Sequence, residues 1–358
     1  MNTYTVNFSS YTIGEDAYEK VSQVCEQYGQ KILLIGGQTA LDKGRLLLEK
    51  AIESSKLKIV DVRLYGKDCT YTEIEKMSKV AEELNVDMIF GMGGGKALDT
   101  AKGAADKAGL PVFTFPTIAA TCAATTALSV VYKEDGNFDS FYFFENPARH
   151  CFIHTQIIAK APECYLRAGM GDTIGKYFEC HFAARGDQLE HSSALGREIS
   201  NMCYPPFLIY GEEALRECRE NRVGVALQQV VLANIVSTGL VSLLVLDDYN
   251  CAIAHSVYYG LVLLPGFEEK YLHGDVVAYG VLVQLAVDKD MERAKEVKAF
   301  LKKIGILTSL SEMQVKLDRE YLKDVLKEIV TGPDMEHIPY PVTEDMIYEA
   351  MQTVEEMS

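Results

Sequence analysis

The stretch FGMGGGKALDTAK at residues 90–102 is the first candidate for chemistry, because four glycines fall within five residues between an apolar run and a helical pattern. Glycines let a backbone approach a diphosphate, and the N–H groups and positive dipole end of the following helix favour that anion. The Walker pattern fails because Phe90 and Ala97 stand where it needs a glycine and a Ser or Thr. The Rossmann fingerprint fails at Lys96. We interpret residues 91–95, the glycine turn, as a phosphate cradle, with a plain strand-to-helix turn as the alternative.

A second candidate for chemistry consists of Asp172, His255 and His273, which lie in small-residue or apolar helical patterns. Two imidazoles and one carboxylate suit Zn²⁺ or Fe²⁺ and leave room for a substrate oxygen. The spacing alone does not bring the three together. A helix-capping carboxylate and hydrogen-bonded core histidines therefore remain the alternatives.

Length and charge limit the class of protein. The 358 residues favour two domains, and a net charge of −16 argues against nucleic acid and anionic membranes as partners. Nine cysteines stand singly and the first residues do not form a basic-then-apolar leader, so we expect reduced thiols and a cytoplasmic location. The longest apolar run, residues 229–246, contains several polar side chains, which favours a buried helix over a membrane span.

The elements that must position these residues change in kind near residue 155. Before it, the β-rich runs KILLI, KIVDVRL, DMIFG and PVFTF alternate with amphipathic segments, which predicts a doubly wound parallel sheet. LSVVYKEDGNFDSFYFF predicts a hairpin around Asp135 and Gly136. After HTQIIAKAP only helical patterns continue. We therefore predict an α/β nucleotide-binding domain over residues 1–158 and an all-α domain, binding metal and substrate, over residues 159–358.

Five motifs carry a family resemblance: GMGGGKALDTAK, PTIAATCAATTALSVVY, AGMGDTIGKYFE, AHSVYYGL and LHGDVVAYGVLVQL. Their order and spacing resemble the iron-containing alcohol dehydrogenase superfamily, in particular its glycerol dehydrogenase branch. The resemblance implies the dehydroquinate synthase-like fold with an active site in the cleft between the two domains. PTIAATCAA, LHG followed by VAYG, and HIPYPVT are most similar to hydroxycarboxylate dehydrogenases, which reduce 2-oxo acids.

The resemblance also assigns residues. It implies that Asp172, His255 and His273 hold one catalytic divalent metal, with Zn²⁺ as the first choice and Fe²⁺ as the alternative. It implies an NAD or NADP cofactor, a small-molecule substrate and a homo-oligomer. The cofactor would contact the glycine turn, the helix after it and the nicotinamide-side positions, which are Gly37, Gly94, Gly95, Lys96, Asp99, Thr117, Thr126, Leu128 and Tyr132.

Departures from the family pattern bear on cofactor and substrate. Gly37 stands where glycerol dehydrogenases place a ribose-binding aspartate, so a 2′-phosphate meets no repulsion there and NADP stays open. Cys122 replaces the polyol-binding aspartate and Ala124 the following proline, while Tyr258 and Tyr259 replace a His and an Asn after the first ligand histidine. We take Cys122 and Tyr258 as substrate residues. The loss of a carboxylate at residue 122 favours an anionic 2-oxo acid over glycerol.

The expected activity is thus a metal-dependent, NAD(P)-dependent alcohol or hydroxycarboxylate dehydrogenase, in which the metal acts as a Lewis acid on the substrate oxygen. A glycerol dehydrogenase is the alternative. A dehydroquinate-synthase-like lyase needs several basic groups, and only Lys176 and Lys270 lie near the helical motifs. A non-catalytic binding protein is a further rival. Tyr132 or Tyr258 could relay a proton or serve only in packing.

Overall fold

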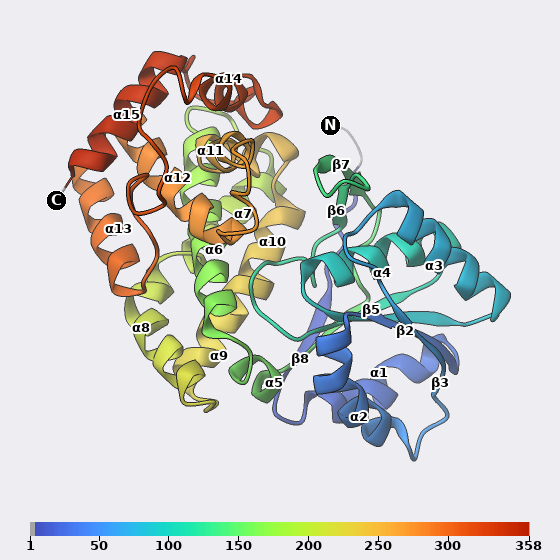
Figure 1. Cartoon of the computed structure of the whole chain (residues 1–358). Coiled ribbons are helices and arrows are strands. Elements are labelled where there is room, and N and C mark those ends of the chain that lie inside the picture. The colour runs from blue at the N-terminus through green and yellow to red at the C-terminus, as the bar shows by residue number, and fades with distance from the viewer. Residues whose placement is uncertain (1–3, 358) are drawn as a thin grey trace. The chain divides into compact units, whose positions relative to one another are not determined.

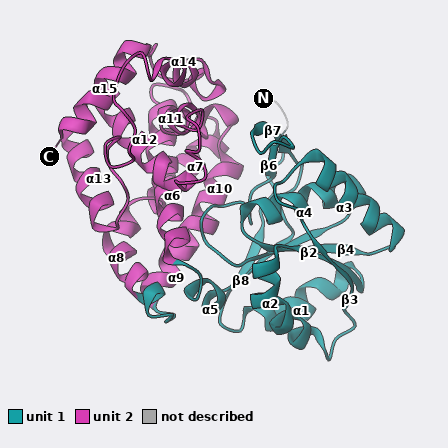
Figure 2. Ribbon diagram, in the orientation of Figure 1, with its two compact units in different colours: residues 1–162, 217–224 teal, residues 163–216, 225–358 magenta. Residues whose placement is uncertain are grey.

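The computed structural model describes residues 4–357, which form two compact units (Figures 1 and 2). The first comprises the chain through Pro162 together with Glu217–Gly224, and the second comprises Glu163–Arg216 and the chain from Val225 onward. The division thus falls four residues after the one expected from the sequence. The segment Glu217–Gly224 is held in the first unit by a hydrogen bond from Gln156 Nε2 to the Asn221 carbonyl at 3.0 Å.

The first unit is built on a six-stranded sheet with the order β1-β8-β5-β4-β2-β3, in which every neighbouring pair is parallel. The four β-rich runs of the sequence form four of these strands, as predicted. The six are β1 (Ser10–Gly14), β2 (Lys31–Gly36), β3 (Lys58–Leu64), β4 (Met88–Gly93), β5 (Val112–Pro116) and β8 (His150–His154). The predicted hairpin is also present, as β6 (Leu128–Tyr132) paired antiparallel with β7 (Phe138–Phe143).

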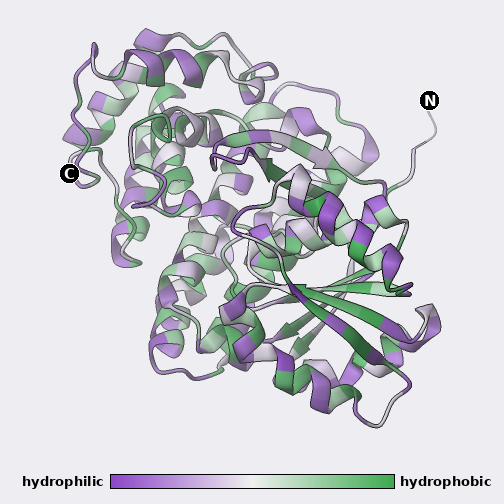
Figure 3. Cartoon of the chain, turned by 45° about the vertical axis from the view of Figure 1, so that its right-hand side comes forward, coloured by the Kyte–Doolittle hydropathy of each residue, from purple (hydrophilic) through white to green (hydrophobic). Residues whose placement is uncertain are grey.

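Helices cover both faces of this sheet, so its central strands are apolar on both sides (Figure 3). On β2, Ile32 and Leu34 belong to the core that includes residues of α1 and α2, whereas Leu33 and Ile35 belong to the core that includes residues of α3 and α4. The helices of this unit are η1 (Ala17–Lys20), α1 (Val21–Cys25), η2 (Glu26–Tyr28), α2 (Gln38–Ile52), α3 (Tyr71–Glu83), α4 (Gly95–Ala108) and α5 (Thr155–Ala159).

The strand order reverses at β2, which has β3 on one side and β4 on the other. Gly36 near the end of β2 pairs with Met92 near the end of β4, so the residues that follow these strands emerge next to each other. Ligands of open α/β sheets bind outside the carboxyl ends of the strands at such a reversal. Gly37 and the glycine turn both lie at this edge.

Two strands were not anticipated from the sequence, β1 and β8. They pair in parallel with Ser10 opposite His150. The buried His150 ring is held by hydroxyls of its neighbour strand, with Nδ1 2.7 Å from Ser10 Oγ and Nε2 2.8 Å from Thr12 Oγ1. The buried His150 ring of β8 therefore finds its hydrogen-bond partners on β1, more than a hundred residues away in the chain.

The second unit is helical in all its described elements, as the sequence predicts. Helices α6 and α12 are buried around most of their circumference, which is typical of core helices. Its α-helices are α6 (Glu163–Ala183), α7 (His191–Ile199), α8 (Pro205–Arg219, whose last three residues belong to the first unit), α9 (Val225–Leu232), α10 (Thr238–Leu244), α11 (Ile253–Leu261), α12 (His273–Val287), α13 (Met291–Lys303), α14 (Lys323–Thr331) and α15 (Glu344–Glu356). Short turns are η3 (Ser200–Met202), the π-helical η4 (Ala233–Ser237), η5 (Asp247–Tyr249) and η6 (Pro333–Met335).

The apolar run noted in the sequence lies within one helical stretch, Val225–Leu244, made of α9, η4 and α10. By length and composition alone this stretch could cross a membrane. In the structure, however, 61% of its most apolar window is buried inside the protein. Asn234 in its middle is fully buried and donates to the Leu166 carbonyl of α6. These contacts are those of a core helix.

Glycines allow α12 to approach its neighbours at backbone distance. A Cβ atom on Gly274 of α12 would lie 1.8 Å from the Ala168 carbonyl oxygen of α6, and one on Gly171 of α6 would lie 2.1 Å from the Gly274 carbonyl oxygen. Farther along α12, a Cβ on Gly280 would lie 2.3 Å from the carbonyl oxygen of Ala254 of α11. Any larger residue at these positions would push the helices apart.

Candidate functional site

Three helices of the second unit bring together the three residues that the sequence singled out as metal ligands. Asp172 comes from α6, His255 from α11 and His273 from the first position of α12. Asp172 Oδ1 lies 3.5 Å from His255 Nε2 and 3.4 Å from His273 Nε2. The three possible ligand atoms all lie within 4.8 Å of one another. The arrangement offers one oxygen and two nitrogen donors to a single cation.

The close helix contacts explain how these side chains meet. Asp172 follows Gly171, and His273 precedes Gly274, so the glycine-to-glycine crossing of α6 and α12 places the two ligands at the same level. His255 follows Ala254, whose carbonyl lies against Gly280 of α12. Each ligand is thus the immediate neighbour of a residue at a backbone-to-backbone contact.

The electrostatics of the group favour an ionised carboxylate. Burial alone would raise the pKa of Asp172, but hydrogen bonding and positive charge from His255 and His273 hold it well below its usual range. Asp172 and His255 are buried, and the His273 side chain is one-third exposed. Of the three, the His273 side chain is thus the most open to solvent.

Glu179 is a functional candidate that the sequence analysis did not single out. It lies on α6 seven residues after Asp172 and is fully buried. Its Oε2 lies 2.5 Å from His255 Nδ1, and its Oε1 accepts hydrogen bonds from the backbone N–H groups of Ala252 and His255, both at 2.8 Å. The spacing of seven on one helix, two turns apart on the same face, is the signal that could have found it.

Other polar groups surround the ligands. The Tyr258 ring packs edge-on against His273 with centroids 4.3 Å apart, and burial raises the pKa of its phenol, which therefore stays protonated. Lys176 donates to the Asn250 side-chain and main-chain oxygens at 2.7 and 2.5 Å. Burial raises the pKa of Asp334, on the turn η6, to about 6. Lys176, one of the two basic groups near the helical motifs, is therefore engaged within this unit.

The glycine turn has the geometry of an anion cradle in the first unit. β4 ends at Gly93, Gly94 is the N-cap of α4, and the helix begins at Gly95. The first N–H groups of an α-helix have no acceptor within the helix and point outward along its axis. A Cβ on Gly94 would lie 2.7 Å from Ile118 Cδ1, so the end of that side chain would have to move to admit a larger residue.

Lys96, expected at the diphosphate, has a protein partner. Its Nζ lies 2.5 Å from Asp68 Oδ1 and 4.4 Å from the centroid of the Tyr132 ring. The ammonium group is thus held next to the N-terminus of α4 by Asp68, a residue that the sequence analysis did not select, and Tyr132 lies beneath it.

A second lysine, Lys102, contacts three of the residues expected at the cofactor: Asp99, Thr126 and Leu128. This lysine is almost fully buried, and its Nζ lies 2.9 Å from Asp99 Oδ1 and 3.2 Å from Thr126 Oγ1. It also donates to the Leu128 carbonyl. Asp99 Oδ2 accepts from the Val130 N–H at 3.2 Å. The structure therefore places these three residues in a buried network that ties α4 to β6.

The remaining selected residues of the first unit lie around the same sheet edge. The Thr117 N–H donates to the Gly93 carbonyl at 3.1 Å. Cys122 is half-buried, and its neighbours Thr121 and Ala123 lie against Gly95, at 3.4 and 3.8 Å from where a Cβ would be. Gly37 is the N-cap of α2 and lies beside the Tyr65 ring. Thr117 and Cys122 thus belong to the surroundings of the glycine turn.

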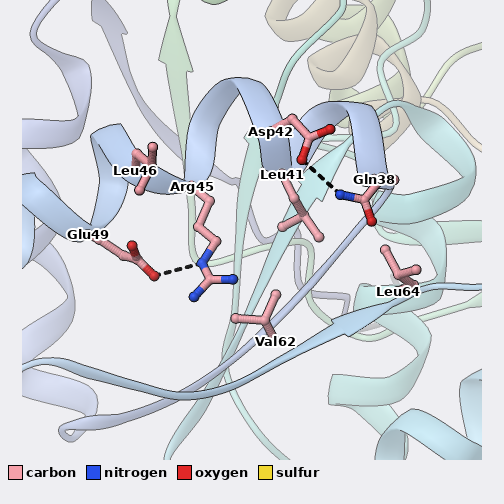
Figure 4. Close-up of a pocket in the computed structure, with 8 residues that line it drawn as sticks. All are labelled: Gln38, Leu41, Asp42, Arg45, Leu46, Glu49, Val62 and Leu64. Carbon is pink, nitrogen blue, oxygen red and sulfur yellow. Dashed lines mark hydrogen bonds and ion pairs between the residues drawn. The ribbon is translucent and has the colours of Figure 1, made fainter.

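A surface groove of about 480 Å³ begins next to Gly37, between α2 and β3 (Figure 4). Two pairs of polar side chains on α2 line it. Gln38 Nε2 donates to Asp42 Oδ1 at 2.8 Å, and Arg45 Nε lies 2.7 Å from Glu49 Oε1. Leu41, Leu46, Val62 and Leu64 supply its apolar part. The groove contains none of the three candidate ligands, and its polar side chains pair with one another.

Comparisons with known proteins identify a family and several relatives of this chain. Residues 9–149 match the family model for iron-containing alcohol dehydrogenase. A glycerol dehydrogenase of Thermotoga maritima is 32% identical over 99% of this chain and 97% of its own length. Hydroxycarboxylate dehydrogenase A of Escherichia coli is 31% identical over 82% of this chain and 81% of its own. A glycerol dehydrogenase structure from Schizosaccharomyces pombe, 23% identical, superposes with a TM-score of 0.90 over all of this chain and 91% of that one.

Proposed function

We propose, because the chain belongs to the iron-containing alcohol dehydrogenase family, that this enzyme transfers hydride between a nicotinamide cofactor and a small 2-hydroxy or 2-oxo acid. The observation that carries the proposal is the meeting of Asp172, His255 and His273 within 4.8 Å on three helices. These residues would hold one divalent metal. The glycine turn would hold the cofactor diphosphate.

The donor set fits a divalent metal. A buried carboxylate facing two imidazole nitrogens is a common ligand set for catalytic zinc and also suits Fe²⁺, so we propose Zn²⁺ with Fe²⁺ as the alternative. When bound, the metal supplies Lewis-acid polarisation of the substrate oxygen, and the nicotinamide supplies or accepts the hydride.

The chain's own residues prepare this chemistry. Asp172 stays ionised because the two histidines hold its pKa low. The Tyr258 ring packs against one side of His273, and its protonated phenol is available as a donor. These groups orient the ligands and shape the substrate side within the second unit.

The cradle in the first unit supports nicotinamide dinucleotide binding. The first turn of α4 points N–H groups at an anion, and the Lys96 ammonium lies beside it. Gly37 follows β2, where a carboxylate would exclude a 2′-phosphate. We therefore propose that the enzyme accepts NAD and tolerates NADP, a point that titration of the apoenzyme with each cofactor tests.

The proposed preference for a 2-oxo acid over glycerol depends on the residue type at Cys122. An aspartate at this position would put a second negative charge near a 2-oxo acid carboxylate. At a separation of about 5 Å and an effective dielectric near 20, the repulsion costs on the order of 3 kcal/mol, or roughly a hundredfold in rate. The thiol of Cys122 avoids that cost. A polyol remains the second candidate, because a relative at 32% identity is named glycerol dehydrogenase.

The test is a turnover screen on enzyme whose metal content has been measured. We expect 2-oxobutyrate reduction to exceed glycerol oxidation in kcat/KM, and Cys122→Asp to shift that ratio toward glycerol, while the matched Cys122→Ser leaves it within a few-fold. If wild type prefers glycerol, or if Cys122→Asp leaves the ratio unchanged, the substrate is a polyol. If His255→Ala keeps full metal occupancy and turnover, the metal assignment is wrong.

A further inference from the structure

A fully buried carboxylate stands directly behind one of the proposed ligands. We propose that Glu179 is a positioning residue that fixes the orientation and tautomer of His255, so that its Nε2 faces Asp172 and is free to bind the metal. This inference rests on the proposed metal site. It adds to that site a residue that does not itself touch the metal.

The placement follows from α6. Asp172 and Glu179 are seven residues apart, which is close to two helical turns, so both project from the same face toward α11. One helix therefore supplies a carboxylate to each side of the His255 ring. Asp172 Oδ1 lies 3.5 Å from Nε2, and Glu179 Oε2 lies 2.5 Å from Nδ1.

The chemistry of the pair determines the tautomer. An ionised carboxylate only accepts hydrogen bonds, so the short contact to Glu179 requires the proton on Nδ1. A histidine must be neutral to bind a metal, and in that state a proton on Nδ1 leaves the lone pair on Nε2, the atom that faces Asp172. Partners of this kind orient ligand histidines and raise their basicity.

Glu179 also holds the backbone that carries His255. Helix α11 begins without a side-chain cap from its own N-cap residue, Ala252. Glu179 Oε1 instead accepts the N–H groups of Ala252 and His255 at 2.8 Å each. Ring and backbone of His255 are thus fixed by the same carboxylate, which leaves the side chain little freedom to rotate away.

A purely structural role would not require this arrangement. Burying a charge is costly unless it is paired and hydrogen-bonded, and Glu179 has no exposed surface. Capping α11 needs only Oε1. The second oxygen contacts Nδ1, so the pairing of the buried charge also fixes the ring of the proposed ligand.

The test is Glu179→Gln, measured as the Zn²⁺ dissociation constant of the full-length apoprotein in competition with a chromogenic chelator. The amide oxygen can still accept the two backbone N–H groups, but the amide NH₂ then faces Nδ1 and forces the ring proton onto Nε2. We expect Zn²⁺ to bind 10- to 100-fold more weakly. The matched control is Glu355→Gln, because Glu355 Oε2 accepts the Leu310 and Ser311 N–H groups in the same unit and touches no histidine.

A double-variant cycle separates positioning from general stability. If Glu179 acts through His255, adding Glu179→Gln to His255→Ala weakens Zn²⁺ binding no further. The same loss in both backgrounds, or an unchanged dissociation constant in Glu179→Gln, overturns the inference. Wild type that binds no Zn²⁺ and no Fe²⁺ refutes the metal site itself instead.

If Glu179→Gln does not fold, a measurement on the wild-type protein tests the tautomer of His255 directly. Nitrogen-15 spectra of the histidine side chains in the Zn²⁺-loaded protein should show His255 with a protonated, hydrogen-bonded Nδ1 and a metal-shifted Nε2. A metal-bound Nδ1 would overturn the inference.

Discussion

Replacing Gly274 by alanine should disrupt the metal site without altering any ligand. The added Cβ would lie 1.8 Å from the Ala168 carbonyl oxygen and 2.9 Å from the Asp172 amide nitrogen. Both are backbone atoms of α6, so no side chain can rotate aside to make room. The variant must separate α12 from α6 at the level where Asp172 and His273 face each other.

The size of the effect follows from these distances. Real Cβ atoms essentially never come closer than 3.0 Å to such neighbours, so the helices must separate by about 1.2 Å. Metal–ligand distances tolerate about 0.2 Å, so we expect a loss of Zn²⁺ affinity of at least a hundredfold, or about 2.7 kcal/mol. Overpacking costs about 1–3 kcal/mol, while alanine gains up to about 1 kcal/mol in helix propensity. A net destabilisation of about 2 kcal/mol is expected.

The assay combines competitive Zn²⁺ titration with denaturant unfolding of the apoprotein. The matched control is Gly211→Ala on α8, where a Cβ would meet only side-chain ends, Phe300 Cζ at 3.2 Å and Met170 Sδ at 3.3 Å. This control should keep its Zn²⁺ affinity and change stability by less than about 1 kcal/mol. Wild-type Zn²⁺ affinity in Gly274→Ala would refute the argument that the backbone crossing sets the ligand geometry.

Three further predictions concern the first unit. Gly94→Val should raise the cofactor dissociation constant at least about tenfold, or 1.4 kcal/mol, and an unchanged cofactor titration of the folded variant would contradict the cradle. Lys102→Met leaves the Asp99 carboxylate buried without its cation and should cost about 3–5 kcal/mol in the free energy of unfolding, which Asp99→Asn in the same chain should partly restore. Burial lowers the pKa of His150 to about 4 from an ordinary 6.5, so the unfolded chain takes up this proton at higher pH than the folded one. The stability due to neutral His150 is complete above pH 6.5 and is lost as the pH falls toward 4, and His150→Gln should flatten that part of a stability-versus-pH curve.

The sequence predicted the elements whose patterns are local. β2, β4 and β5 are continuous apolar runs because helices cover both faces of the sheet, and the Asp135–Gly136 turn identifies the hairpin. The sequence did not predict β1 and β8, because the residue pattern of each strand makes sense only when the two strands are paired. The polar residues Ser10 and Thr12 are explained only by the His150 ring on the neighbouring strand.

The candidate metal site also depends on contacts between distant parts of the chain, which the sequence pattern does not reveal. Nothing in the spacing of Asp172, His255 and His273 indicates that they meet, and the family resemblance rather than periodicity suggested it. Their approach depends on which faces of α6, α11 and α12 touch. Glu179 has a helical spacing from Asp172, but its role depends on the N-terminus of α11, some seventy residues later. Asp68, the partner of Lys96, lies 28 residues before it in the chain, in a segment without a motif.

The segment Glu217–Gly224 has a consequence for biosynthesis. It completes the first unit, yet the ribosome makes it about 60 residues after Pro162. At roughly 5–20 residues per second, the nascent first unit waits several seconds for its last piece. During that interval the carbonyls of Ala159 and Ala161 lack the Cys218 thiol that lies 3.7 and 3.5 Å from them in the finished protein. A gene fragment that stops at Pro162 would preserve this unfinished state permanently, so dissecting the enzyme into separately expressed halves requires moving the segment to the first half.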